Sequence, residues 1–189
     1  MSEKPSESLR DQQRAVKRGQ VIGLAIATIV LGLGIALVPT SLTDESTPGE
    51  RLAFALKADI LVVFWLVHCV AMLGRHRFYS AEDIGGAGLT SPTAKARELQ
   101  AVLQNTLEQV VLAIVVHALW AVVMPVRWAA GILAATGLFA LGRFFFIRGY
   151  SRGAGARALG FVLSFYPTMF MLFVVIVVTI ITSVRAFIA

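Results

Sequence analysis

The sequence contains little charge and little cysteine, and each shortage excludes a class of protein. Charged residues make up 15% of the 189 residues and apolar residues 57%, whereas a soluble domain is usually about 25% charged and about 45–50% apolar. This composition excludes a soluble globular domain, a disordered chain, a collagen-like repeat and a coiled coil. The one cysteine, Cys69, excludes an internal disulfide framework and a cysteine-rich metal site.

Motifs for several chemistries are also missing. The sequence has no HExxH zinc motif, no serine-hydrolase elbow and no nucleotide-binding fingerprint. Its net charge of +6 is confined to short segments between apolar runs, without interleaved aromatic residues, so we expect no nucleic-acid partner. His68 and His117 each lie alone in an apolar run, which favours hydrogen bonding between helices over metal binding.

Long apolar runs are abundant instead, and the mean hydropathy is +0.77. A hydrocarbon core of about 30 Å needs about 20 apolar residues of helix to cross it. Five stretches qualify: Val21–Val38, Leu52–Leu73, Leu99–Met124, Trp128–Ile147 and Leu159–Ile181. The first is too long for a typical signal-peptide core, so we interpret it as an uncleaved span. The sequence therefore predicts an all-α membrane protein with five spans.

The basic residues alternate between the two sides of these spans, 13 against 4. The richer side comprises the leader and the second-to-third and fourth-to-fifth connections, whereas the first-to-second loop carries Asp44, Glu45 and Glu50. Because lysine and arginine in short loops stay cytoplasmic, we expect the N-terminus in the cytoplasm and the C-terminus outside. Within the second span, Asp59 near Lys57 predicts a local ion pair. In the next connection, Ser91 before Pro92 predicts a helix N-cap.

Ionisable residues inside spans indicate a site, because each needs a partner or a role. Asn105 and Glu108 are three residues apart and share a helical face early in the third span. Arg143 lies toward the same end of the fourth span, so a Glu108–Arg143 contact would satisfy both charges. Tyr150 and Arg157 follow at seven-residue intervals, and the glycines between them predict a turn that returns Arg157 to the same cleft. The alternatives are an ion pair that only fixes helix packing, and ordinary positive-inside topology.

Two segments resemble the MAPEG family, the membrane-associated proteins in eicosanoid and glutathione metabolism. They are Gln104-Asn105-Thr106-Leu107-Glu108 and Arg143-Phe-Phe-Phe-Ile-Arg-Gly-Tyr150-(x)6-Arg157. The resemblance implies a four-helix membrane domain over residues 52–187. An extra transmembrane helix would precede it at 20–40, after a polar cytoplasmic leader at 1–19. Together with the alanine-, glycine-, valine- and arginine-rich composition, similarity to bacterial members implies a bacterial inner membrane.

The resemblance also implies a cofactor and its site. Asn105, Glu108, Arg143 and Tyr150 match glutathione-contacting positions, and Arg157 matches the position proposed in the family to activate the thiol. A guanidinium favours thiolate over thiol, and arginine pairs bidentately with carboxylates such as those of glutathione. Catalytic family members differ at three positions, which here are Ala101 instead of arginine, and Gln109 and Phe146 instead of tyrosine.

Three functions follow as hypotheses. The first is a glutathione-dependent transferase or peroxidase that acts on a lipophilic electrophile, as a homotrimer with glutathione between subunits. The second, favoured by Ala101, is a non-catalytic lipid-binding or scaffold protein with the same helical frame. The third, a small transporter or channel, would need polar residues through the whole bilayer, whereas the sequence places them toward one side.

Overall fold

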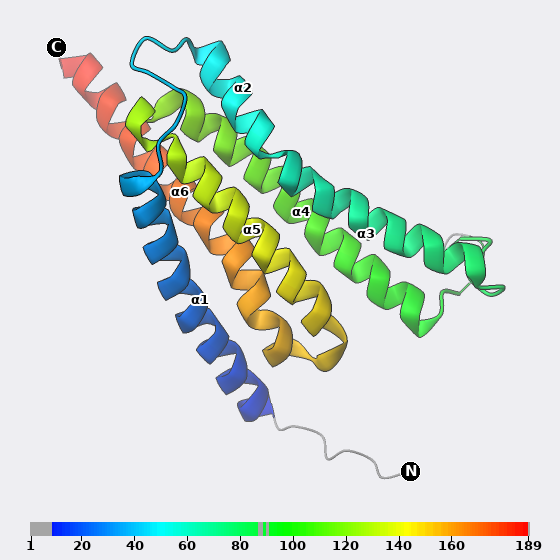
Figure 1. The fold of residues 1–189 in the computed structure, drawn as a ribbon. Coiled ribbons are helices and arrows are strands. Elements are labelled where there is room, and N and C mark those ends of the chain that lie inside the picture. Colours follow the sequence, from blue (N-terminus) through cyan, green and yellow to red (C-terminus); the bar gives the residue numbers. More distant parts are fainter. Residues whose placement is uncertain (1–8, 87–88, 90, 189) are drawn as a thin grey trace.

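The computed structural model describes residues 9–86, 89 and 91–188, and all regular structure in that part of the chain is helical. Five helical units there are long and apolar enough to cross a membrane, which confirms the predicted spans. The helices are α1 (Leu9–Leu37), α2 (Pro48–Ala58), α3 (Ile60–Tyr79), α4 (Ala94–Val123), α5 (Ala130–Gly149) and α6 (Ala154–Ile188). They run up and down, so α1 begins and α6 finishes at opposite ends of the bundle (Figure 1).

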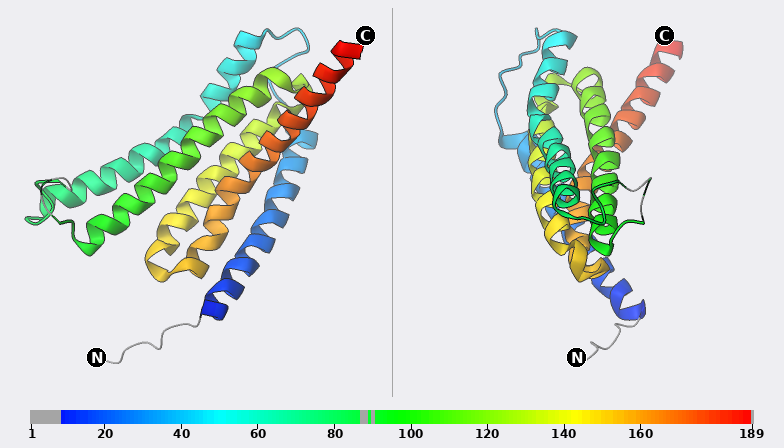
Figure 2. Two further views of the ribbon diagram at one scale, coloured as in Figure 1. Left: turned by 180° about the vertical axis from the view of Figure 1, so that it is seen from behind. Right: turned by 90° about the vertical axis from the view of Figure 1, so that its right-hand side faces the viewer.

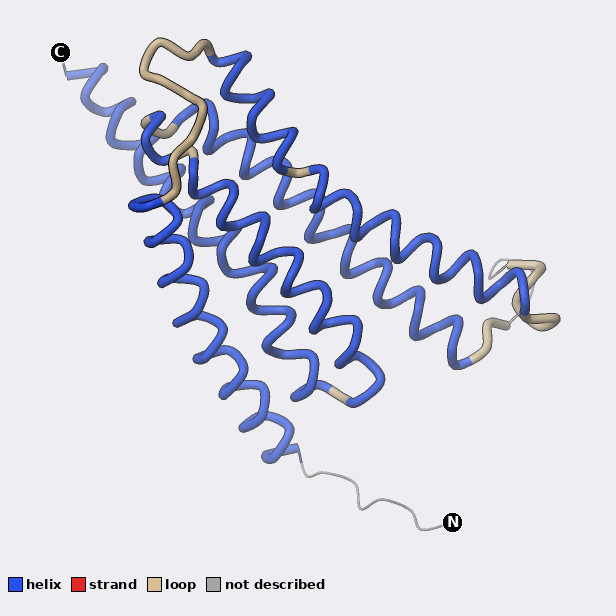
Figure 3. Tube along the Cα trace, viewed as in Figure 1, coloured by secondary structure: helices blue, strands red, loops and turns tan. Residues whose placement is uncertain are grey.

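The second span consists of two helices in line, α2 and α3, with a single-residue break between them (Figure 3). The start of α2 is a capping box, in which the Thr47 hydroxyl accepts from the Glu50 amide and the Glu50 carboxylate accepts from the Thr47 amide. Pro48 occupies the first helical turn, where no amide hydrogen is needed. The break falls at Asp59, whose side chain is buried.

The helices form two groups that separate toward one end of the bundle. The α3–α4 hairpin packs closely along itself, while α5 and α6 pack against each other and against α1 (Figures 1 and 2). The α5–α6 contact is tight because it lacks side chains at its centre. A Cβ atom on Gly142 would lie 2.7 Å from the Gly160 carbonyl oxygen. Small residues let membrane helices approach this closely.

Helix α1 attaches to α6 and α5 through a similar row of small residues. A Cβ on Gly19 would lie 2.9 Å from the Ala158 Cβ, and one on Gly23 would lie 2.5 Å from a Val162 methyl carbon. Residues 9–19 of the predicted leader belong to this continuous helix, and residues 1–8 lie outside the described residues.

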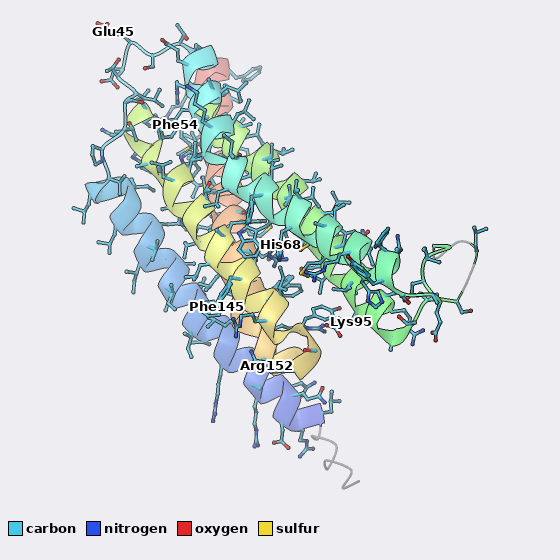
Figure 4. The ribbon with its side chains drawn as sticks, turned by 45° about the vertical axis from the view of Figure 1, so that its right-hand side comes forward. Glu45, Phe54, His68, Lys95, Phe145 and Arg152 are labelled. Atoms are coloured by element: carbon cyan, nitrogen blue, oxygen red, sulfur yellow. The ribbon has the colours of Figure 1, made fainter. Side chains whose placement is uncertain are left out.

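Two connections, α3 to α4 and α5 to α6, lie at the same end of the bundle, which we call the basic end (Figure 1). Lys95 and Arg152 lie at this end and Glu45 at the opposite one (Figure 4). The second connection is the predicted glycine turn: Gly149 ends α5, a 3-10 turn spans Tyr150–Arg152, and Gly153 adopts a left-handed φ of +98°.

The predicted N-cap at Ser91 is wrong, because Thr93 caps α4 and its hydroxyl accepts from the Ala96 amide. The Asp83 carboxylate holds Thr93 in place by accepting from its amide at 2.9 Å and its hydroxyl at 2.7 Å. Ser80 donates to the same carboxylate, and His76 Nε2 lies 2.9 Å from it. These hydrogen bonds, those from Thr93 first, hold the pKa of Asp83 well below its ordinary value.

Candidate functional site

Arg143 lies at the centre of the site and is completely buried between α4, α5 and α6. Its guanidinium donates to the Asn105 amide oxygen at 3.0 Å, to the Thr106 hydroxyl at 3.4 Å and to the Ser164 hydroxyl at 2.7 Å. Its Nε has no hydrogen-bond partner, and no carboxylate of the described residues lies within ion-pair distance. The hydrogen bonds of this buried cation to Asn105, Thr106 and Ser164 are therefore all to neutral oxygen atoms.

A chain of stacked groups connects Arg143 to the turn between α5 and α6. The guanidinium carbon of Arg143 lies 4.3 Å from the centre of the Phe146 ring, and this ring packs edge-on against Tyr150 at 5.4 Å. The guanidinium of Arg157 lies 4.4 Å from the centre of the Tyr150 ring. The structure thus brings Asn105, Arg143, Tyr150 and Arg157 together.

Glu108 does not join them, and the hypothesis of a Glu108–Arg143 contact is wrong. Its carboxylate instead accepts from the Gln104 side chain at 3.0 Å, on an exposed face of α4. Helical spacing puts Glu108 near Gln104 but rotates it away from the inward face that carries Thr106. Burial of this carboxylate beside Arg143 would also have required its desolvation.

Arg157 lines a small pocket of about 240 Å³ that α1 helps to form. Val16 and Gln20 of α1 face Phe146 and Phe161 across it. The pocket is mostly apolar, with the guanidinium as its one cationic group. In this arrangement the guanidinium could stabilise a thiolate, and the apolar cavity could hold a lipophilic molecule that reacts with it.

The three departures from the catalytic family pattern have distinct surroundings. Phe146 is buried and stacks on Arg143. Gln109 is buried, and neither atom of its amide has a hydrogen-bond partner in the described part of the chain. Ala101 lines an open cavity of about 340 Å³ on the outer face of α4, together with Arg77 and Arg97.

A second buried polar cluster lies near the opposite end of the bundle, and sequence reasoning missed it. Asp59 is buried and its Oδ1 lies 2.6 Å from His117 Nδ1 and 3.4 Å from the Thr136 hydroxyl. The predicted Asp59–Lys57 ion pair is therefore wrong, since Lys57 points outward. The prediction that His117 hydrogen-bonds between helices is confirmed.

This cluster also corrects the expectation that polar residues gather toward one side. An apolar group consisting of Val62, Val110, Ala113 and Phe139 packs between the two clusters. On α5, for example, Phe139 lies between Thr136 and Arg143 in the sequence. Among the described residues, the hydrogen bonds around Arg143 and those around Asp59 therefore form two separate clusters.

Sequence reasoning also missed Thr106 and Ser164, although both hold Arg143. Thr106 donates to the Val102 carbonyl and Ser164 to the Gly160 carbonyl. Hydroxyl groups in helices commonly bond to the carbonyl four residues earlier, so neither residue stands out in a sequence. The one available signal was the position of Thr106 beside Asn105.

Five apolar helical spans with charged side chains held inside the bundle define a multi-pass integral membrane protein. The sequence model of the MAPEG family matches residues 52–177, which is 126 of the 189 residues. The chain therefore belongs to the MAPEG family. The matched region begins in α2 and ends in α6, so α1 is an additional helix in front of it. No curated protein and no solved structure matches the chain.

Proposed function

We propose that this protein is a glutathione-dependent transferase or peroxidase that acts on lipophilic electrophiles. The observation that carries the proposal is the packing of Arg157 on Tyr150, beside an apolar pocket and in line with Arg143 and Asn105. Family membership supplies glutathione as the cofactor to which these positions correspond. Arg157 would be the catalytic residue, and Asn105, Glu108, Arg143 and Tyr150 would bind glutathione.

In the transferase reaction, bound glutathione would supply the thiolate nucleophile that displaces a leaving group, with its bonding electron pair, from an electrophilic carbon. The guanidinium of Arg157 would stabilise the thiolate over the thiol. Tyr150 fixes the guanidinium by stacking on it. The apolar walls of the pocket would exclude water from the reacting sulfur.

The exposed carboxylate of Glu108 supports the homotrimer as the active form. A charge on a lipid-facing surface at membrane depth is expensive, and an ammonium group of glutathione held against a neighbouring subunit would compensate it. The proposal also retains a cytoplasmic N-terminus, an external C-terminus and a bacterial inner membrane. It keeps the division into a polar leader at residues 1–19, of which residues 9–19 are the start of α1, an extra transmembrane segment at 20–40 and a catalytic domain at 52–187.

Complete burial of Arg143 favours a second candidate, a non-catalytic lipid-binding or scaffold protein. In the described structure its guanidinium is sealed by packing that includes Phe146. Ala101, and Gln109 with its unpartnered amide, are consistent with a protein that keeps the helical fold of the family but lacks contacts to a cofactor. In this case Arg143 would only fix the packing of α4, α5 and α6.

Glutathione binding and turnover separate the two candidates. Calorimetry on the detergent-purified protein should show glutathione binding that is lost in Arg143→Ala. The control Arg152→Gln changes an exposed arginine in the turn between α5 and α6 and should bind glutathione normally. Conjugation of a halodinitrobenzene, or reduction of a lipid hydroperoxide, should fall at least about 100-fold in Arg157→Gln with glutathione binding largely retained. Absence of binding at millimolar glutathione would refute the enzyme and leave the scaffold.

A further inference from the structure

A cleft of about 590 Å³ lies between α3, α4 and α5 at the basic end. The α3–α4 hairpin separates from α5 at this end (Figures 1 and 2). Its floor is apolar and consists of Met72, Leu99, Val102 and Ile147. Each of these residues lies at or within one end of a predicted span. The cleft therefore lies at the level where hydrocarbon meets water. None of the five residues of the candidate glutathione site is among its lining residues.

The rim of this cleft is cationic. Arg75 and Arg148 line it from α3 and α5, both are exposed, and neither has a carboxylate partner among the described residues. Lys95 is already neutralised by Glu98 at 3.0 Å. The hydroxyl groups of Tyr79 and Ser151 also line the cleft, as does Ser80, whose hydroxyl already donates to Asp83. Two guanidinium groups without a carboxylate partner among the described residues thus line one cleft with an apolar floor, and that of Arg148 also lies 5.4 Å from the centre of the Phe144 ring.

This combination selects one class of ligand, an amphiphile with an anionic head. Guanidinium groups bind phosphate oxygens bidentately, and basic pockets between transmembrane helices at the cytoplasmic boundary bind acidic lipid head groups. A free anion would leave the apolar floor uncovered. A zwitterionic lipid would bring its own cation toward the arginines.

We propose that the cleft binds one anionic phospholipid, with its phosphate between Arg75 and Arg148 and an acyl chain against Met72 and Ile147. The floor residues Val102 and Ile147 pack in the same group as Phe146, the ring beneath Arg143. A bound lipid therefore covers the packing that seals Arg143 from the cytoplasmic side. The proposal needs no glutathione chemistry and is independent of the proposed function.

Native mass spectrometry of the full chain, stripped of lipid in a neutral detergent, tests this site. One phosphatidylglycerol per chain should bind at least about tenfold more tightly than phosphatidylcholine. The double variant Arg75→Gln/Arg148→Gln should lose this preference. The matched control Arg18→Gln/Arg152→Gln removes the same charge from exposed positions outside the cleft lining and should keep the preference.

A second variant tests the floor with both charges retained. Met72→Trp fills the cleft and should weaken phosphatidylglycerol binding about as much as the double arginine change, with unchanged helix content by circular dichroism. Equal loss in the control double variant would refute the site in favour of diffuse surface charge. Displacement of the lipid by millimolar inorganic phosphate, or by millimolar glutathione, would also overturn the proposal, because the cleft would then be a site for a free anion.

Discussion

Replacement of Gly142 by alanine tests whether the close α5–α6 crossing holds the candidate site together. The added Cβ would lie 2.7 Å from the Gly160 carbonyl oxygen, 2.7 Å from the Ser164 amide nitrogen and 3.0 Å from the Ser164 Cβ. Two of these three atoms belong to the backbone of α6, so no side-chain rotation relieves the contact. Ordinary contact begins at 3.4 Å, and the helices must therefore separate by about 0.7 Å.

Gly142→Ala should lower the free energy of unfolding by about 1–3 kcal/mol, because overpacking of a tight contact typically destabilises a protein by this amount. Gly137 provides the matched control, because a Cβ on it meets nothing within 4 Å. Both substitutions gain about 0.5–1 kcal/mol of helix propensity, so this gain cancels between them. With about 2–4 °C per kcal/mol for a chain of this length, Gly142→Ala should melt about 2–12 °C below Gly137→Ala.

Cys69 makes the measurement simple, because it is the single cysteine of the sequence and is buried. A fluorogenic thiol reagent added during a thermal ramp in detergent therefore reports unfolding of the bundle itself. The separation also pulls Ser164 away from Arg143, so Gly142→Ala should weaken glutathione binding in parallel. Identical melting of the two alanine variants would refute the close crossing and the argument that it positions Arg143.

The same melting assay tests two other contacts, and a pH titration tests the connection before α4. Gly23→Leu should lower the melting temperature by about 2–12 °C, since even a Cβ there lies 2.5 Å from Val162, whereas Gly32→Leu, with nothing within 4 Å, should not. Ser164→Ala removes an acceptor from buried Arg143 and should cost about 1–3 kcal/mol; equal stability of the exposed Thr182→Ala control and this variant would contradict that. For Asp83, whose pKa is lowered on folding, the stabilisation is complete above its unfolded pKa of about 3.9 and is lost as the pH falls through the folded pKa. Protection of the Thr93 amide from hydrogen exchange should therefore fall below about pH 4, and a titration unchanged by Asp83→Asn would argue against this carboxylate.

Much of the frame is predictable because it depends on local quantities. The length of each apolar run alone decides whether a helix can cross the bilayer, and the structure has its five spans where the sequence places them. The neighbourhood of Tyr150 and Arg157 was predictable for a similar reason. Gly149 ends α5 just before Tyr150, and Gly153 with its left-handed φ follows, so the next helix turns back beside Tyr150.

The partners of charged residues were not predictable in the same way. Spacing shows that Asn105 and Glu108 are close on α4, but not which of them turns toward the interior. Asp59 and His117 are 58 residues apart, so the sequence does not show that they are neighbours. The break between α2 and α3 at Asp59 has no clear sequence signal either. In the sequence, the nearby Lys57 is therefore the more obvious partner for Asp59. Such pairs are decided by the rotation of whole helices, which depends on packing across the bundle.

The row of small residues that joins α1 to α6 also bears on how the protein is made. Helix α1 is synthesised before its main partner, α6, and the end of α6 at Ile188 lies 151 residues after Leu37. At roughly 5–20 residues per second, synthesis leaves α1 without that partner for about 8–30 s. During this interval its glycine face contacts lipid or the insertion machinery. Closure of the bundle therefore waits until α6 has been synthesised, and a chain truncated before α6 would leave this face open to other small-residue helices in the same membrane.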